Sequence, residues 1–319
     1  MEEFNFICAD KSMWPASANI FSIADDQGII LIDVGCGLKK FVKKLYRKLE
    51  TFHIDINNLH TIVISHAHPD HMGAIKWLFN DMRDYHNLTI IINEIEKPSA
   101  LNIDLLNKSF DIDLIRKYLK TNWRNRLGGF NDINDSFKML CAMSQLPEDT
   151  NIITIKNNDL LNLGNYTFRV LTTPGHAPGH TSFYEINKKF LLSGDLIGEK
   201  GTAWYSPSSG GAVGYLKSLD KVDKLEIKRI YPSHGNEFSD GKIKTRIEEI
   251  RNKITDKDRI ILKELENGQK KVLDLVKLFY RSQFSQIFPG IAIVESHLIK
   301  LEDEDKIKRK NRLIKSLKS

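Results

Sequence analysis

Short apolar runs recur along most of the chain and alternate with longer stretches whose apolar residues are spaced three or four positions apart. Runs bounded by Gly, Pro, Asp or Asn are typical of buried β-strands, whereas the wider spacing indicates amphipathic helices. Strands separated by helical stretches predict an α/β fold. The predicted strands comprise residues 28–32, 61–65, 88–92, 166–171, 189–192 and 227–231, and a helix is expected over 72–80.

Two segments depart from this rhythm. Between residues 97 and 150 the strand pattern stops, and the spacing of Ile112, Ile115 and Leu119 indicates a helical insertion. From residue 238 to 319 the pattern is helical again, with helices expected over 242–266, 271–284 and 293–301. A length of 319 residues also favours two domains. We therefore predict a catalytic domain over 1–237, with the insertion near its active site, and a helical, basic domain over 238–319.

Composition removes several classes of protein. Hydrophobic residues make up 41% of the chain, too many for a disordered protein, and no apolar stretch reaches the ~18 residues of a membrane-spanning helix. Glu2 and Glu3 stand where a secretory signal would carry basic residues, so we expect a cytoplasmic protein. The cysteines, Cys8, Cys36 and Cys141, are too scattered for a disulfide framework or a C-x-x-C metal site.

The charge is unevenly distributed. The net charge is +6, and residues 236–319 account for all of it with 20 Lys and Arg against 14 Asp and Glu. The last fourteen residues, 306–319, contain seven basic residues and no acid. Such a tail is either a solvated helix end or a contact for an anionic partner such as RNA. It could also pair two subunits into a homodimer.

Four of the predicted strands end in a histidine or an aspartate. The first runs into H-x-H-x-D-H, and the others run into T-P-G-H, S-G-D and P-S-H-G. Loops beyond the carboxyl ends of strands gather at one edge of an α/β fold and form its site. These loops carry five histidines and two aspartates, enough for two metal ions: His66, His68, Asp70, His71, His176, Asp195 and His234.

The spacing within the first motif separates its ligands into two sites. His66 and His68 project to the same side of an extended backbone, whereas Asp70 and His71 follow the turn at Pro69 and can reach a second ion. Imidazole and carboxylate ligands suit zinc, which we favour, and also iron or manganese. A pair of divalent ions activates a bridging water and polarises a carbonyl or phosphoryl oxygen, which predicts hydrolysis.

These motifs resemble the metallo-β-lactamase superfamily over residues 19–235. The resemblance implies a four-layer αβ/βα sandwich. It implies that His66, His68 and His176 bind the first metal, that Asp70, His71 and His234 bind the second, and that Asp195 bridges. It also implies that Asp33 and His180 support the site without binding metal.

Departures from known subfamilies narrow the resemblance. The best-known β-lactamases have cysteine at the position of Asp195, and flavodiiron relatives have glutamate at the position of His68. Antibiotic hydrolysis and oxygen reduction are therefore disfavoured. The sequence is similar to glyoxalase II, acyl-homoserine lactonases, persulfide dioxygenases and lactamase-like endoribonucleases. Its end resembles the winged-helix-like segment of the last group.

The favoured function is hydrolysis of an ester, thioester or lactone in a small molecule by a metal-bridging hydroxide, with Asp70 orienting the water and carrying a proton. The alternatives are an endoribonuclease whose basic C-terminal domain contacts RNA, a mononuclear iron persulfide dioxygenase, and a non-catalytic metal-bound binding module. Candidate substrate-binding residues lie in the insertion and after Asp195; they are Trp123, Arg124, Arg126, Trp204 and Tyr205. Tyr205 would donate a hydrogen bond to the oxyanion.

Overall fold

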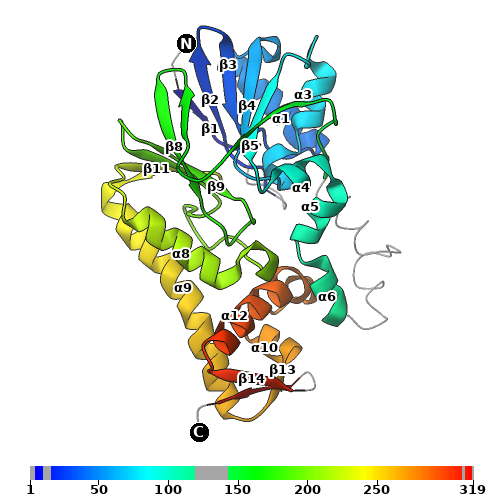
Figure 1. Cartoon of the computed structure of the whole chain (residues 1–319), viewed down its shortest axis with the longest axis vertical. Helices are drawn as coiled ribbons and strands as arrows, with labels where there is room; N and C mark the ends of the chain where they lie inside the picture. The colour runs from blue at the N-terminus through cyan, green and yellow to red at the C-terminus, as the bar shows by residue number, and fades with distance from the viewer. Residues whose placement is uncertain (1–3, 10–15, 119–142, 311–312, 318–319) are drawn as a thin grey trace.

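The computed structural model describes residues 4–9, 16–118, 143–310 and 313–317. Two β-sheets occupy one end of the molecule, and a mainly helical C-terminal part occupies the other (Figure 1). The long helix α9, Asp240–Glu266, runs along the side from the sheets to the C-terminal part (Figure 1). Among the helices of these described ranges, none has both the length and the apolar character that crossing a membrane requires.

The first sheet has six strands in chain order. They are β1 Phe4–Ile7, β2 Ile20–Asp25, β3 Gly28–Ile32, β4 Leu59–Ile64, β5 Thr89–Asn93 and β6 Asn151–Ile155. The first three pair antiparallel, and β3 to β6 pair parallel. Parallel pairing needs long crossovers, which the intervening helices supply.

The second sheet also has six strands, in the order β12-β11-β10-β9-β8-β7. They are β7 Leu160–Leu163, β8 Tyr166–Thr172, β9 Thr181–Glu185, β10 Phe190–Gly194, β11 Arg229–Pro232 and β12 Phe238–Ser239. Only β10 and β11 pair parallel, and the helix α8, Gly211–Asp223, connects them. All six strands predicted from the sequence are present, with ends displaced by at most two residues.

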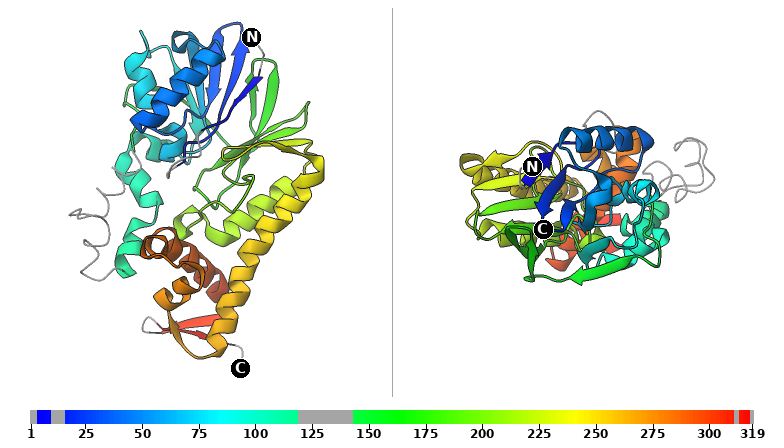
Figure 2. Two further views of the ribbon diagram at one scale, coloured as in Figure 1. Left: turned by 180° about the vertical axis from the view of Figure 1, so that it is seen from behind. Right: turned by 90° about the horizontal axis from the view of Figure 1, so that it is seen from above.

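The layers follow from alternating side chains. Ile30 and Ile32 of β3 face the second sheet and pack in one cluster with Phe168 and Phe183, whereas Leu31 between them packs in the cluster of α1, Lys39–Thr51. A third cluster joins the second sheet to α8 and α9. Figure 2 shows α1 (blue) and α9 (yellow) on opposite outer sides of the two sheets. This arrangement is the predicted four-layer αβ/βα sandwich.

One predicted helix is interrupted. Residues 72–80 form the end of α2, Pro69–Met72, and most of α3, Ile75–Asp81. The break occurs because the Ala74 amide donates to the Gly35 carbonyl, at 2.9 Å. Gly73 also approaches the neighbouring loop closely, since a Cβ at this position would lie 2.5 Å from the backbone nitrogen of Gly37.

The predicted insertion is helical where it is described. It contains α4 Lys97–Leu101, α5 Ile103–Ser109 and α6 Ile112–Tyr118. These helices lie between β5 and β6 in the chain, and α6 lies beside the C-terminal part in space (Figure 1). Residues 119–142, which include the candidates Trp123, Arg124 and Arg126, fall outside the described ranges.

The C-terminal part is helical, as predicted, and contains a small sheet that the sequence analysis missed. Its helical elements after α9 are α10 Val272–Phe279, α11 Gln283–Ser285, η4 Gln286–Gly290 and α12 Ile291–Asp303. The expected helix over 271–284 stops early because Tyr280 adopts extended backbone angles. The tail is a β-hairpin and not a helix end: β14 Ile307–Lys310 and β15 Leu313–Ser316 pair with each other, and β15 also pairs with β13, Lys270–Lys271.

Candidate metal centre

Ends of strands from both sheets meet at one site. From the first sheet, β4 leads directly into His66, His68 and the start of α2. From the second sheet, β8, β10 and β11 lead into His176, Asp195 and His234. The seven candidate ligands form two groups, in each of which the possible ligand atoms all lie within 4.8 Å of one another. The groups are His66, His68 and His176, and Asp70, His71, Asp195 and His234.

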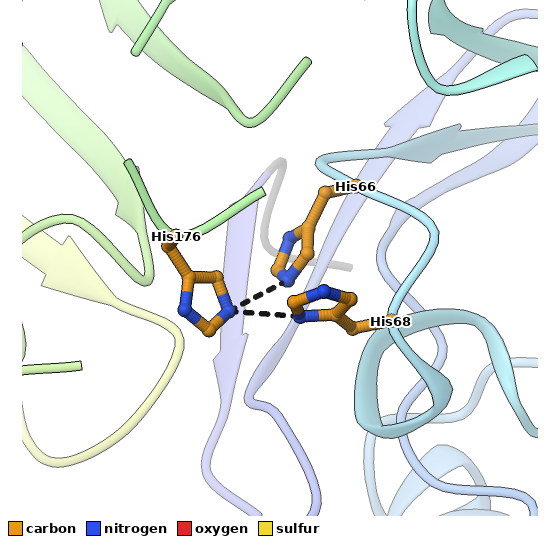
Figure 3. Close-up of side chains that lie close together, drawn as sticks. All are labelled: His66, His68 and His176. Atoms are coloured by element: carbon orange, nitrogen blue, oxygen red, sulfur yellow. Dashed lines mark hydrogen bonds between the residues drawn. The ribbon is translucent and has the colours of Figure 1, made fainter. Parts of the chain in front are cut away.

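The first group is a cluster of buried imidazoles. His176 Nε2 lies 3.2 Å from His66 Nε2 and 2.9 Å from His68 Nδ1, so three ring nitrogens converge (Figure 3). Burial lowers the pKa of both His66 and His68 well below the ordinary range, and neighbouring imidazoles lower them further. These rings are therefore neutral, which is the form that binds a metal ion.

The second group is built around Asp195. Its Oδ1 lies 3.2 Å from His71 Nε2 and 3.4 Å from His234 Nε2, while its Oδ2 lies 3.2 Å from His176 Nε2 of the first group. The fourth member, Asp70, has its Oδ2 3.2 Å from His234 Nε2. The side chains of His234 and Asp70 are 34% and 21% exposed, against 6% for Asp195, so the second group is the more open one.

The electrostatics of the second group differ from those of the first. Burial would raise the pKa of Asp195, but His234, His71 and His176 hold it well below the usual value, so the carboxylate is ionised. Burial would lower the pKa of His234, but Asp195 and Asp70 raise it to about 10.

The residues fit divalent metal ions. His68 Nε2, His71 Nε2 and Asp195 Oδ1 are buried and make no well-formed hydrogen bond among the described residues; His71 Nε2 and Asp195 Oδ1 face only members of the same ligand groups, with 3.2 Å between the two atoms. Buried polar atoms normally have a partner, so a cluster without partners needs an explanation. Convergent imidazole nitrogens and carboxylate oxygens, with no thiolate, match the donor set of zinc, iron or manganese.

Asp33 binds the candidate ligand His71 through the ring nitrogen that faces away from Asp195. Its Oδ2 accepts from His71 Nδ1 at 2.8 Å, and its two oxygens accept from the amide and the hydroxyl of Ser65 at 2.8 Å each. This contact fixes the proton on Nδ1 and leaves Nε2 facing Asp195. A carboxylate bound to the far nitrogen of a histidine orients the ring and makes it a stronger ligand.

His180 supports the site in a different way. Its Nε2 accepts from the backbone amide of Asp195 at 2.9 Å, and its Nδ1 donates to Thr173 Oγ1 at 2.8 Å. Burial lowers the pKa of His180 to about 3, so the ring is neutral. Because both nitrogens are engaged, neither is available to a metal ion, and the ring instead fixes the backbone that carries Asp195.

Glu96 is a site residue that the sequence analysis missed. Its side chain is buried, and its two oxygens accept from the Ala67 amide at 2.9 Å and the Gly179 amide at 2.6 Å. One carboxylate thus joins the loop of the first two ligands to the loop of His176. The available signal was an acid placed shortly after the apolar run that forms β5.

The candidate substrate residues that are described lie in different surroundings. The Trp204 ring lies 5.9 Å from that of His68 and 6.0 Å from that of His176, and it packs against Phe110 and Phe288, both at 5.4 Å. The expectation for Tyr205 is wrong. Its side chain is 1% exposed and its hydroxyl is bound to His297 Nε2 at 2.7 Å, so it does not face a substrate.

Comparisons with known proteins agree with this geometry. The family model of the metallo-beta-lactamase superfamily matches residues 13–234. The chain is 26% identical over 308 residues to the beta-lactamase-like protein 2 homolog of Drosophila melanogaster, covering 94% of this chain and 87% of that protein. It is 23% identical to the human acyl-coenzyme A thioesterase MBLAC2, covering 69% and 74%.

A solved structure extends the likeness to the C-terminal part. The metallo-beta-lactamase family protein TTHA1429 from Thermus thermophilus superimposes with a TM-score of 0.75 at 19% identity, covering 99% of both chains. At this identity the match speaks for the fold alone. Because the family model spans most of the chain and ends at the last of the converging histidines, the chain belongs to the metallo-beta-lactamase superfamily, as a metal-dependent hydrolase.

Proposed function

We propose that the protein hydrolyses an ester, thioester or lactone bond of a small molecule with two divalent metal ions, zinc being favoured. His66, His68 and His176 hold the first ion, and Asp70, His71 and His234 hold the second. The observation that carries the proposal is the position of Asp195, whose two oxygens face the two groups at 3.2 Å from His176 Nε2 and from His71 Nε2. A single carboxylate can therefore bridge both ions.

The chain supplies the proton chemistry around the ions. When bound, the ions would supply Lewis acidity and lower the pKa of a metal-bound water. Asp70 is the partly exposed carboxylate of the site, and His71 and His234 hold its pKa below the ordinary value although burial opposes them. It is therefore ionised, orients the attacking water and accepts its proton for delivery to the leaving group.

An acyl thioester is the substrate class we favour among the three. One relative is named an acyl-coenzyme A thioesterase. Phe110 and Trp204 lie beside the ring of His68, and Phe288 packs against Trp204, so the first ligand group has aromatic neighbours that suit an acyl group. A charged or highly hydroxylated acyl group would gain little binding free energy from such neighbours.

Cleavage of RNA is a second candidate, because the C-terminal sheet presents a basic face. The pairing register places four exposed lysines on one side of this sheet, and Lys308 stands directly opposite Lys315. Like charges in facing positions destabilise a hairpin unless something neutralises them. A phosphate backbone would do so. We call this surface the lysine face; it consists of Lys271, Lys308, Lys310 and Lys315.

We retain the division into a catalytic domain over 1–237 and a C-terminal domain over 238–319 as a proposal. Ser239 precedes the first turn of α9, close to the proposed boundary. Side chains of α9, α10 and α12 belong to the same core cluster as the first sheet, however. Limited proteolysis that releases a stable fragment ending near residue 237 would support the division. Proteolysis that cuts the chain elsewhere but not near residue 237 would contradict it.

The decisive experiment is a panel of substrates assayed on a sample whose metal content is measured. The proposal expects turnover of thioesters, esters or lactones with two ions per chain. RNA cleavage that falls with rising salt and in Lys308→Glu would favour the second candidate. Activity only with one iron per chain would indicate the dioxygenase, and two tightly bound ions without any turnover would indicate a binding module.

A further inference from the structure

A buried chain of hydrogen bonds links the C-terminal part to the active-site segment. Tyr205 Oη lies 2.7 Å from His297 Nε2, and His297 Nδ1 lies 2.7 Å from Asp258 Oδ1. Asp258 Oδ2 accepts from Lys300 Nζ at 2.8 Å. His297 has no exposed surface, and Tyr205 is 1% exposed. Asp258 of α9, with His297 and Lys300 of α12, thus fixes the position of the Tyr205 hydroxyl.

The residue before Tyr205 touches the metal centre. The backbone carbonyl of Trp204 accepts from His176 Nδ1 at 2.6 Å, which leaves His176 Nε2 directed toward the first group. The indole of Trp204 also lies beside the rings of His68 and His176. Displacement of the Trp204–Tyr205 backbone would therefore turn a proposed ligand and shift its neighbours.

Helix α12 also binds the chain a few residues after Tyr205. Ser296, which precedes His297 on α12, accepts from the amide of Ala212 at 2.7 Å near the start of α8. Phe288, just before α12, packs against the Trp204 ring at 5.4 Å. Contacts from one C-terminal region therefore fix the segment from Trp204 to Ala212 at both of its ends.

We propose that α12 is part of the active site, and that His297 is a positioning residue which, through Tyr205 and the Trp204 carbonyl, orients His176 toward its metal ion. The inference rests on the proposed role of His176 as a ligand. A buried polar network of this kind need not stabilise the fold, because apolar residues of similar volume often stabilise a protein equally well. Its contribution here is geometric.

The test compares two variants with a matched control. Tyr205→Phe removes only the hydroxyl. His297→Gln removes the imidazole ring that joins this hydroxyl to Asp258. Tyr184→Phe is the control, because Tyr184 is also buried and its hydroxyl donates to a backbone carbonyl, that of Glu226, at 2.8 Å. This residue lies at the end of β9 remote from the ligands. Affinity for each of the two ions is measured by competition with a chelator, beside thermal unfolding.

The expected result is that Tyr205→Phe and His297→Gln weaken one of the two ions about 10-fold to 100-fold, the range for residues that orient a metal ligand. The second ion and the Tyr184→Phe control keep the wild-type affinity. The inference would be overturned if Tyr205→Phe bound both ions with wild-type affinity and lost only as much thermal stability as the control. If His297→Gln does not fold, Tyr205→Phe still decides.

The two proposals fail in different ways. A wild-type protein that binds no metal would overturn the proposed function and the inference together. A wild-type protein with two ions whose binding ignores the Tyr205 hydroxyl would leave the proposed function standing and would reduce α12 to a packing element.

Discussion

Replacement of Glu96 by glutamine tests whether the two ligand loops depend on one buried carboxylate. In the wild type, both oxygens accept from backbone amides, at 2.9 Å from Ala67 and 2.6 Å from Gly179, and the residue is 2% exposed. Glutamine keeps one oxygen and turns an amino group, which can only donate, toward the other amide. One of the two backbone N–H groups therefore loses its acceptor.

The magnitude follows from that count. A buried N–H without a partner costs about 1–3 kcal/mol, so Glu96→Gln should lower the free energy of unfolding by about 2 kcal/mol. Glu96→Ala removes both acceptors and should cost about twice as much. Affinity for the metal ion of the first group should also fall, because Ala67 lies between His66 and His68.

The assay is denaturant unfolding of the metal-free protein, followed by metal titration of the folded variants. Glu94→Gln is the control, since this neighbouring acid is exposed and its carboxylate pairs with the exposed Lys156 at 3.4 Å. It should change stability by less than about 0.5 kcal/mol. If Glu96→Gln is as stable as Glu94→Gln and binds metal as the wild type does, the carboxylate does not join the loops.

Three further predictions concern other parts of the molecule. Asp33→Asn should weaken the ion held by His71 about 10-fold to 100-fold in a chelator competition, because the ring loses its charged partner, and unchanged affinity would contradict this. Lys308→Glu should stabilise the hairpin by about 0.2–1 kcal/mol in thermal unfolding by pairing with Lys315, and destabilisation would contradict the register. Burial lowers the pKa of His297 although Asp258 opposes it, so this ring contributes stability above the unfolded pKa of about 6.5 that is lost as the pH falls. In His297→Gln the loss of stability on acidification should be shallower by up to about 1.4 kcal/mol per pH unit, and parallel curves would refute the assignment.

The convergence of the candidate ligands could be predicted because four of them come shortly after an apolar run. The end of a strand limits where the next residues lie, so pattern and topology brought His66, His176, Asp195 and His234 to one edge. The four-layer arrangement, by contrast, came from the family resemblance. The apolar runs alone did not reveal that β7 to β10 pair antiparallel.

What could not be predicted depends on partners distant in the chain. Tyr205 was expected at the substrate, but the residue that binds its hydroxyl lies 92 positions later, in α12. Glu96 was not predicted, because the two amides that it binds belong to other loops. The terminal hairpin was hidden by its charge: Ile307 and Ile314 face the core, but lysines dominate the composition around them.

Asp195 would contribute to both of the metal ions that the proposed hydrolysis requires. Elemental analysis of wild type and Asp195→Ala, with turnover recorded on the same samples, tests this role. We expect two ions per wild-type chain, with fewer ions and no turnover in the folded variant. A wild type that is fully active without metal, or an Asp195→Ala variant that keeps both ions and its activity, would contradict this expectation.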